Sequence, residues 1–361
     1  MASEWTDAIE RARENAPFLA RSLDRLPALA ELLSQGDADA AFEYAARAGE
    51  GAETGVALRR ERLALALTLA IGDLAGAFTL DDVMQRLSAF ADIALDRAIA
   101  EAARARTTLE SVDGFFALAL GKHGAGELNY SSDIDPILLF DPDVLASGAR
   151  SGPGETAQRM ARDIVRLLAD HTEEGYVFRV DLRLRPAAEI APLAVSVNAA
   201  ASHYESAALA WERAAFIRAR SAAGDVVRGE RFLASIRPFV WRRSVDFGAI
   251  DDIAQLRLRI REAYGGEPVL GPGFDLKRGR GGIREIEFFA QTHQLIHGGR
   301  DPRLRSSDTR AALLALARAG IVEEETARAL AAAYARLRVA EHRIQMLEDR
   351  QTHMVPEGEA L

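Results

Sequence analysis

The sequence predicts an α+β protein in which a small sheet lies between helical regions. Residues 1–110 are rich in Ala, Leu, Arg and Glu, which favour helix. Two apolar runs of strand length, 115–120 and 136–140, flank a glycine-rich loop. After residue 302 the apolar side chains follow helical spacing again. These three observations together give the order helices, sheet, helices.

The N-terminal region carries helical patterns and no motif with an evident chemical role. Helices are predicted over 38–47, 55–71 and 80–106, each with an amphipathic pattern. Thr79 is a candidate N-cap for the last of these, because acidic residues follow in the first turn. We therefore expect residues 1–110 to form a helical packing or docking domain.

The loop between the two predicted strands has the composition of a phosphate and metal site. It reads Gly-Lys-His-Gly-Ala-Gly-Glu-Leu-Asn-Tyr-Ser-Ser-Asp-Ile-Asp over 121–135. Glycine allows the backbone to approach a phosphate closely. Asp133 and Asp135 are two apart at a strand start, so their side chains leave the same face. Neighbouring carboxylates repel unless a cation lies between them, and Mg²⁺ binds carboxylate and phosphate oxygens. An ordinary surface turn is the alternative.

A third carboxylate stands in an alternating segment, 176–185, that precedes Pro186 and follows a helix predicted over 155–173. Apolar and polar residues alternate from 178 onward, which is typical of a half-buried strand. Its polar face carries one acid and three bases: Arg179, Asp181, Arg183 and Arg185. Such a face suits a metal-bound triphosphate or phosphodiester. A solvated face on which Asp181 pairs with its arginines fits the same pattern.

Residues 274–296 predict a short strand, a basic glycine loop and a helix. Backbone amides at a helix start form an anion site when cations stand beside them. Three basic residues occupy the loop: Lys277, Arg278 and Arg280. Glu285 and Glu287 are two apart on the helix, so at most one points into a site. His293 follows the apolar spacing and is expected to be packed in the core.

Further helices are predicted over 202–220, 246–262, 307–319 and 323–349. Residues Tyr204, Ala208, Trp211 and Ala215 form one apolar stripe, and Leu337, Ala340, Ile344 and Leu347 form another. Arg218 and Arg220 are not assigned to the site. His342 and His353 lack the spacing of metal ligands and are given no role.

The composition excludes several classes of function. A chain of 361 residues with 48% hydrophobic content forms two or three domains. It has no cysteine, as in proteins of a reducing cytoplasm. The apolar run 63–71 is too short to span a membrane, and the polar N-terminus is unlike a signal peptide. A net charge of −9 argues against nucleic-acid binding. We expect a soluble cytoplasmic protein with no membrane or nucleic-acid partner.

From about residue 110 onward the chain resembles glutamine synthetase adenylyltransferase/adenylyl-removing enzyme. The resemblance is carried by Gly121-Lys122 through Ser132-Asp133-Ile134-Asp135, by Arg-Val-Asp-Leu-Arg-Leu-Arg-Pro over 179–186, by Trp211-Glu212-Arg213 and by Gly-Gly-Ile-Arg-Glu-Ile-Glu-Phe over 281–288. Members of that family contain two nucleotidyltransferase halves of the DNA polymerase β type. One half adds AMP to a tyrosine of glutamine synthetase, and the other removes it by phosphorolysis and releases ADP.

Details of the motifs are similar to the N-terminal, adenylyl-removing half. These are Glu-Leu-Asn-Tyr-Ser-Ser over 127–132, the Gly-Gly-Ile-Arg-Glu phrase, and His-Gly-Gly-Arg-Asp-Pro over 297–302. A single Asp-x-Asp hairpin of this kind occurs, so the chain is expected to be one half. After the helical domain expected over 1–110, the resemblance implies a nucleotidyltransferase domain over 111–290, built on a small mixed sheet and with a helical insert at about 199–265. It also implies the start of a helical bundle over 291–361.

The resemblance also implies the site. The metal-binding and catalytic carboxylates are Asp133, Asp135 and Asp181, with Mg²⁺ as the cofactor. Residues that contact phosphate or nucleotide are Gly121, Lys122, Ser132, Arg183, Arg185, Lys277 and Arg280. The implied partners are glutamine synthetase, the PII signalling protein, inorganic phosphate and ADP or ATP.

Two positions depart from the family pattern, and alternatives of function stay open. His123 replaces an aliphatic residue and Pro136 replaces a leucine. Proline has no N–H to donate. Either the backbone nitrogen of residue 136 faces away from a partner strand, or a ladder hydrogen bond is lost and the hairpin is distorted. The alternatives are AMP transfer from ATP to the same tyrosine, a non-catalytic nucleotide- or PII-binding module, and a stand-alone small-molecule nucleotidyltransferase.

Overall fold

The computed structural model describes residues 2–108, 111–147, 151–242 and 271–356. The helix predicted over 246–262 lies outside these ranges. Within them, no helix combines the length and the apolar character needed to cross a bilayer.

The N-terminal region is helical, as predicted. Its helices are α1 (Ala2–Asn15), α2 (Pro17–Arg25), α3 (Pro27–Gln35), α4 (Ala38–Arg47), α5 (Thr54–Leu74) and α6 (Leu80–Arg106). The Thr79 hydroxyl accepts a hydrogen bond from the Asp82 amide at 3.2 Å, and the Asp82 carboxylate accepts one from the Thr79 amide at 2.9 Å. This capping box starts α6 where the sequence predicts it.

A four-stranded mixed sheet stands at the centre of the described chain, with strand order β3-β2-β1-β4. Its strands are β1 (Phe115–Leu120), β2 (Asp135–Phe140), β3 (Ala194–Ser196) and β4 (Arg220–Gly224). β1 pairs antiparallel with β2 and β4, whereas β2 pairs parallel with β3. The strands predicted over 115–120 and 136–140 are confirmed. β3 and β4 were not predicted, because β3 has three residues and β4 lacks an alternating pattern.

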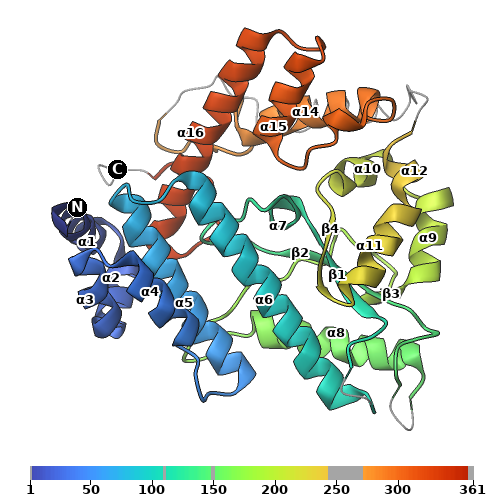
Figure 1. Ribbon diagram of the computed structural model, residues 1–361, viewed down its shortest axis with the longest axis horizontal. Coiled ribbons are helices and arrows are strands. Elements are labelled where there is room, and N and C mark those ends of the chain that lie inside the picture. Colours follow the sequence, from blue (N-terminus) through green and yellow to red (C-terminus); the bar gives the residue numbers. More distant parts are fainter. Residues whose placement is uncertain (1, 109–110, 148–150, 243–270, 357–361) are drawn as a thin grey trace.

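Both faces of the sheet are covered. Alternate residues of the two central strands enter different clusters: Phe115, Ala117 and Leu138 join the large core with α6 and α8 (Pro153–Ala169), while Phe116, Leu118 and Ile137 join a second core. Helices α9 (Val197–Ser206), α11 (Val226–Ser235) and α12 (Arg237–Val240) lie on that second side (Figure 1). The predicted helix 155–173 corresponds to α8.

The single helix predicted over 202–220 is wrong. The chain forms α9, then α10 (Ala210–Phe216), and then β4. The break arises because Glu212 caps a new helix: its carboxylate accepts a hydrogen bond from the Leu209 amide at 2.7 Å and lies 2.8 Å from His203 Nε2. Tyr204 is buried in the second core, but Trp211 is partly exposed, so the predicted apolar stripe is interrupted.

The strand predicted over 176–185 is reduced to one bridge. The Ile134 amide donates to the Arg179 carbonyl at 3.0 Å, and the Asp181 amide donates to the Ile134 carbonyl at 2.9 Å. The chain then turns, because the Asp181 carboxylate accepts the Arg183 amide at 2.9 Å. Pairing therefore ends at the carboxylate, and Leu184 packs on the second core rather than with Val180.

Pro136 fits the sheet without distorting the hairpin. Successive residues of a strand direct their N–H groups to opposite sides. Ile134 bonds toward the 179–181 segment, so residue 136 faces the same side, away from β1. There Pro136 lies between the Ile134–Val180 bridge and the start of β3 pairing at Leu138. The missing N–H thus removes no bond from the β1–β2 ladder.

The C-terminal region contains α14 (Ile283–His297), the 3₁₀ turn Pro302–Leu304, α15 (Thr309–Arg318) and α16 (Glu324–Glu348). α14 and α15 pack against α16 around their own apolar cluster. Figure 1 shows α16 running from that cluster toward the N-terminal helices. His293 is partly buried against Phe289, in agreement with a packing role.

The chain after α16 returns to the sheet side of the molecule. The Leu276 amide donates to the His353 carbonyl at 2.8 Å, and the Val355 amide donates to the Phe274 carbonyl at 2.9 Å. This short antiparallel contact replaces the predicted strand at 274 and places residues 351–354 beside the loop 121–135.

Candidate active site

A cavity of about 910 Å³ collects most of the residues that the sequence nominated. The predicted residues that line it are Gly121, Lys122, Ser132, Asp133, Asp135, Asp181, Arg183 and Lys277. They come from four parts of the chain: the short helix α7 (Gly121–Ala125) that follows β1, the residues at and just before the start of β2, the 181–183 turn and the loop before α14.

Two predicted residues lie outside this cavity. The Arg185 guanidinium donates to the carbonyls of Leu182 at 2.8 Å and Ala188 at 2.7 Å, so it folds its own loop back. Arg280 is exposed and does not line the cavity. Pro186 explains the first case, because the chain cannot continue as a strand there and its carbonyls need donors.

The three carboxylates are brought together by the Ile134–Val180 bridge. Ile134 lies between Asp133 and Asp135, and its bridge partner directly precedes Asp181. Burial, together with like-charge repulsion from Asp181 and Asp133, raises the pKa of Asp135 to about 7. All three carboxylates line the same cavity.

Asp133 and Asp181 each also have protein partners. Arg179 Nε donates to Asp133 Oδ1 at 2.6 Å, and Gln351 Nε2 donates to Asp133 Oδ2 at 2.8 Å. Arg183 Nε donates to Asp181 Oδ1 at 2.9 Å, and this hydrogen bond lowers the pKa of Asp181. Asp181 therefore both faces the cavity and pairs with an arginine, which combines the two readings of its strand.

The donor set suits Mg²⁺ with substrate phosphate as a further ligand. Among the described residues, no three acidic or histidine side chains approach closely enough to enclose an ion. Mg²⁺ is usually held by one or two carboxylates, with waters and phosphate oxygens completing its octahedron. The repulsion at Asp135 is the kind that a bound divalent cation relieves. One or two of Asp133, Asp135 and Asp181, which all line the cavity, therefore have the donor chemistry that could hold Mg²⁺ together with phosphate and water.

Lys122 lines the cavity and forms a buried ion pair with Glu341. This pair was not predicted from the sequence. Its Nζ donates to both oxygens of Glu341 at 2.7 and 2.8 Å. Burial lowers the pKa of Lys122 to about 8, and Glu341 only partly offsets that effect. Burial opposes ionisation of Glu341 too, but Lys122, His353 and Arg338 together hold its pKa well below the usual range. The pair is thus charged at neutral pH.

Several cavity residues were not nominated from the sequence. They are Leu184, Trp211, Arg218, Asp275, Arg284, Gln345, Gln351, Thr352, His353 and Met354. Of the two glutamates on α14, Glu287 faces the cavity and Glu285 accepts the Gly281 amide at 2.9 Å, which confirms that at most one points inward. Arg218, which the sequence left unassigned, is buried and pairs with Glu287 at 3.0 Å.

Two family models match parts of the chain. A family model described as glutamate-ammonia ligase adenylyltransferase matches residues 7–235, and a second, described as GlnD PII-uridylyltransferase, matches residues 254–360. The first match covers more than half of the chain. The chain belongs to the glutamate-ammonia ligase adenylyltransferase family.

Curated relatives in this family are long proteins. The chain is 46% identical over 364 residues to a bifunctional glutamine synthetase adenylyltransferase/adenylyl-removing enzyme of Caulobacter vibrioides, covering 96% of the chain and 36% of the relative. Proteins of the same name from Xanthobacter autotrophicus and Rhizobium meliloti are 46% and 44% identical, covering 88% and 85% of the chain and 33% and 32% of each relative. The chain spans about a third of the length of these adenylyltransferases.

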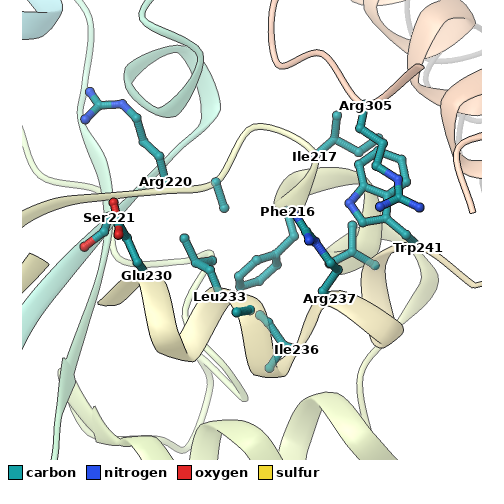
Figure 2. A pocket seen from close by; sticks show the side chains of 13 residues that line it. Phe216, Ile217, Arg220, Ser221, Glu230, Leu233, Ile236, Arg237, Trp241 and Arg305 are labelled. Carbon is teal, nitrogen blue, oxygen red and sulfur yellow. The ribbon is translucent and has the colours of Figure 1, made fainter. Parts of the chain in front are cut away.

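A second cavity, of about 520 Å³, is distinct from the carboxylate site of this adenylyltransferase-family chain. Figure 2 shows apolar side chains such as Phe216 and Leu233 between Arg220 at one end and Arg305 at the other. None of the residues nominated from the sequence lines it. Arg220 is held elsewhere, since it donates to Asp92 at 2.8 Å.

Gly121 allows close approach of the backbone to Asp135. Gly121 has φ +57°, and a Cβ there would lie 2.5 Å from Asp135 Oδ2. Gly126, at the other end of the helix α7 (Gly121–Ala125), has φ +74° and open space around its Cβ position. Both substitutions to alanine cost about 1 kcal/mol of backbone strain.

We expect Gly121→Ala to displace the Asp135 carboxylate and to reduce turnover about a hundredfold, as for a 1 Å misplacement of reacting groups. Gly126→Ala should lower thermal stability to a similar degree and keep full turnover. Steady-state assays and thermal melts of both variants test this. Equal activity of the two variants would show that the contact at Gly121 is irrelevant to catalysis.

Proposed function

We propose that this chain removes AMP from adenylyl-tyrosine of glutamine synthetase by Mg²⁺-dependent phosphorolysis. The observation that carries the proposal is the convergence of Asp133, Asp135 and Asp181 on one cavity that also holds Lys122, Arg183 and Lys277. The family and the names of the relatives support glutamine synthetase as the protein substrate. The motifs of the 127–132 and 281–288 segments favour the removing direction.

In the proposed architecture, a nucleotidyltransferase core of the DNA polymerase β type spans 111–290, between helical domains over 1–110 and 291–361. The placement of carboxylates at the start of β2, on a small mixed sheet, supports it. Strand β4 belongs to the sheet, so the proposed core includes 220–224 although these residues fall within the range of the expected insert.

The reaction joins a phosphate oxygen to the adenylyl phosphorus and breaks the bond from phosphorus to the tyrosine oxygen. ADP forms, and the phenolate leaves and takes a proton from water. Its conjugate acid has a pKa of about 10, so no strong general acid is needed. A bound Mg²⁺ supplies positive charge for the phosphoryl oxygens. Lys122, Lys277 and Arg183 offset the repulsion between inorganic phosphate and the phosphodiester.

The direct test is incubation of the chain with adenylylated glutamine synthetase, Mg²⁺ and inorganic phosphate. We expect ADP to appear at the rate at which adenylyl groups are lost, and neither to occur without phosphate. Consumption of ATP with release of pyrophosphate and new adenylyl-tyrosine would instead establish the forward reaction. Mg²⁺-dependent binding of ADP or ATP without any product would establish a non-catalytic nucleotide-binding module.

A regulatory partner is proposed on narrower ground. The second matching family model is described as a PII-uridylyltransferase, so its members act on the PII protein. Its match covers residues 254–360, which include α14, α15 and α16. We propose this C-terminal region as the part that responds to PII, and a pull-down of PII by the chain tests that assignment.

Lys122 makes phosphorolysis sensitive to pH. Its folded-state pKa of about 8 lies below the ordinary value of 10.5, so the folded protein loses this proton as pH rises through about 8. Below pH 8 the buried charge lowers the free energy of unfolding, and this destabilisation is gone above the unfolded-state pKa. Because the ammonium faces the cavity, we expect the KM for phosphate to rise above pH 8, by about tenfold for one pH unit at most.

The matched control is Lys122→Arg, since arginine keeps its proton throughout this range. The arginine variant should show a KM for phosphate that stays flat from pH 7.5 to 9.5, whatever its absolute value. Initial-rate measurements at fixed Mg²⁺ decide the matter. If the rise persists in Lys122→Arg, a different group causes it.

A further inference from the structure

A chain of hydrogen bonds leads from outside the cavity to Asp133, and its centre is the phenol of Tyr176. A hydroxyl has one donor and two acceptor positions. The Tyr176 hydroxyl uses all three: it donates to Asp349 Oδ2 at 3.1 Å and accepts from Arg62 Nη2 at 3.2 Å and from Arg179 Nη1 at 2.8 Å. The ring is buried, with 8% of its surface exposed. Its hydroxyl therefore has one orientation.

Arg179 connects the fixed Tyr176 hydroxyl to the Asp133 carboxylate. Its planar guanidinium donates from Nη1 to Tyr176, from Nη2 to the Ser131 carbonyl at 2.7 Å, and from Nε to Asp133 Oδ1 at 2.6 Å. All three nitrogens are engaged on different partners, so the plane of the group is fixed. A fixed donor at one oxygen fixes the rotation of the Asp133 carboxylate.

At the other end of this hydrogen-bond network, two helices that are far apart in the sequence contact the Tyr176 hydroxyl. Arg62, on α5, donates to both oxygens of Asp349 at 2.9 and 3.0 Å. Asp349 is the residue that ends α16, in a left-handed conformation with φ 49°. Both side chains are 10% exposed. Arg62 on α5 and Asp349 at the end of α16 thus both contact the Tyr176 hydroxyl.

Asp133 keeps coordination sites free in this arrangement. Each carboxylate oxygen has two acceptor positions. Arg179 occupies one on Oδ1 and Gln351 occupies one on Oδ2, which leaves one on each oxygen for an ion. The contacts orient the carboxylate without blocking it.

We propose that Tyr176 and Arg179 are positioning residues that hold the Asp133 carboxylate in the orientation required for Mg²⁺, and that the Arg62–Asp349 pair fixes them through the Tyr176 hydroxyl. The proposal rests on the proposed function, because it assigns a metal to Asp133. It predicts that loss of one hydroxyl, remote from the cavity, weakens metal binding.

The test variant is Tyr176→Phe, which removes the hydroxyl and keeps the ring. Tyr130→Phe is the matched control, because the Tyr130 hydroxyl is buried near the same loop and has no hydrogen-bond partner among the described residues. For Tyr176→Phe we expect the Mg²⁺ concentration at half-maximal phosphorolysis to rise about tenfold, as for loss of an outer-shell partner of a metal ligand, with the KM for phosphate unchanged. Tyr130→Phe should match the wild type in both.

A direct measurement of metal binding separates this proposal from the proposed function. Mn²⁺ binding, followed by calorimetry with ADP present, should be about tenfold weaker in Tyr176→Phe than in the wild type. If the wild type binds Mn²⁺ but forms no ADP from adenylylated substrate, the proposed function fails and the binding comparison still decides on the positioning role. Wild-type protein that binds no Mn²⁺ overturns the positioning role as well.

Two further results would overturn the proposal. One is a Tyr176→Phe protein with unchanged metal affinity. The other is equal loss of metal affinity and phosphate affinity, as a general loss of structure would produce. Should Tyr176→Phe not fold, Arg179→Lys replaces it, because lysine keeps the charge and loses the planar set of donors. The same shift in metal affinity, with phosphate affinity kept, is then expected.

Discussion

Asp135→Asn should reduce the proposed phosphorolysis about a thousandfold while making the metal-free protein more stable. The carboxylate is one of three around the proposed Mg²⁺ site, and loss of several kcal/mol of charge stabilisation in the transition state corresponds to about this factor. In the absence of metal, however, the charge of Asp135 is opposed by burial and by Asp181 and Asp133. An uncharged amide removes that repulsion, so the melting temperature at pH 8 should rise.

The matched control is Asp143→Asn, on an exposed carboxylate beyond the other end of β2. It should change neither the rate nor the melting temperature. ADP release and thermal melts with and without Mg²⁺ provide the measurements. A rise in stability without loss of activity would leave Asp135 as a buried charge with no part in metal binding. Loss of both would mean that the carboxylate supports the fold.

Local patterns nominated the three carboxylates that line the larger cavity. The spacing of Asp133 and Asp135 at a strand start placed both on one face, and the short apolar runs on either side are strands β1 and β2. Asp181 was found by its alternating segment, even though that segment forms only one bridge. The Ile134–Val180 bridge brings Asp181 beside the segment that carries Asp133 and Asp135.

Contacts between distant parts of the chain were beyond the reach of sequence patterns. Gln351 and Asp133 are 218 residues apart, and Lys122 and Glu341 are 219 apart. Gln351 is a polar residue just after a helix, and its local sequence does not indicate that it faces a cavity formed by another segment. Trp211 was misplaced and Arg218 was left unassigned for a related reason, because the capping by Glu212 divides the helix predicted over 202–220.

Helix α16 shows most clearly what a periodicity argument misses. Its apolar stripe includes Ile344, which is buried as predicted. A second face is also buried, and it is polar: Arg338, Glu341, His342 and Gln345 are each almost fully covered. Hydrophobic spacing identifies only the first face, since charged residues are usually exposed unless paired. The partners lie on the loop 121–135 and could not be assigned from α16 alone.

Arg338→Leu should be the most destabilising of the substitutions considered, at about 3–5 kcal/mol, the usual loss when one partner of a buried charge network is removed. The Arg338 side chain has no exposed surface. It donates to Glu127 Oε2 at 3.1 Å and to the Glu127 carbonyl at 2.6 Å, and its Nε lies 3.1 Å from Glu341 Oε2. Leucine leaves two buried carboxylates with fewer cations.

Arg336→Leu is the control within the same helix, because Arg336 is exposed and its replacement should change the free energy of unfolding by less than about 0.5 kcal/mol. Urea unfolding of both variants supplies the comparison.

The cause of the destabilisation can then be isolated with Glu127→Gln in the Arg338→Leu background. If the loss comes from an unpaired buried charge, the neutral amide restores part of it, although Glu127→Gln alone destabilises. If the loss comes from a cavity, the second change adds to it. Restoration would also imply that the network, rather than packing alone, holds α16 against the loop that carries Lys122.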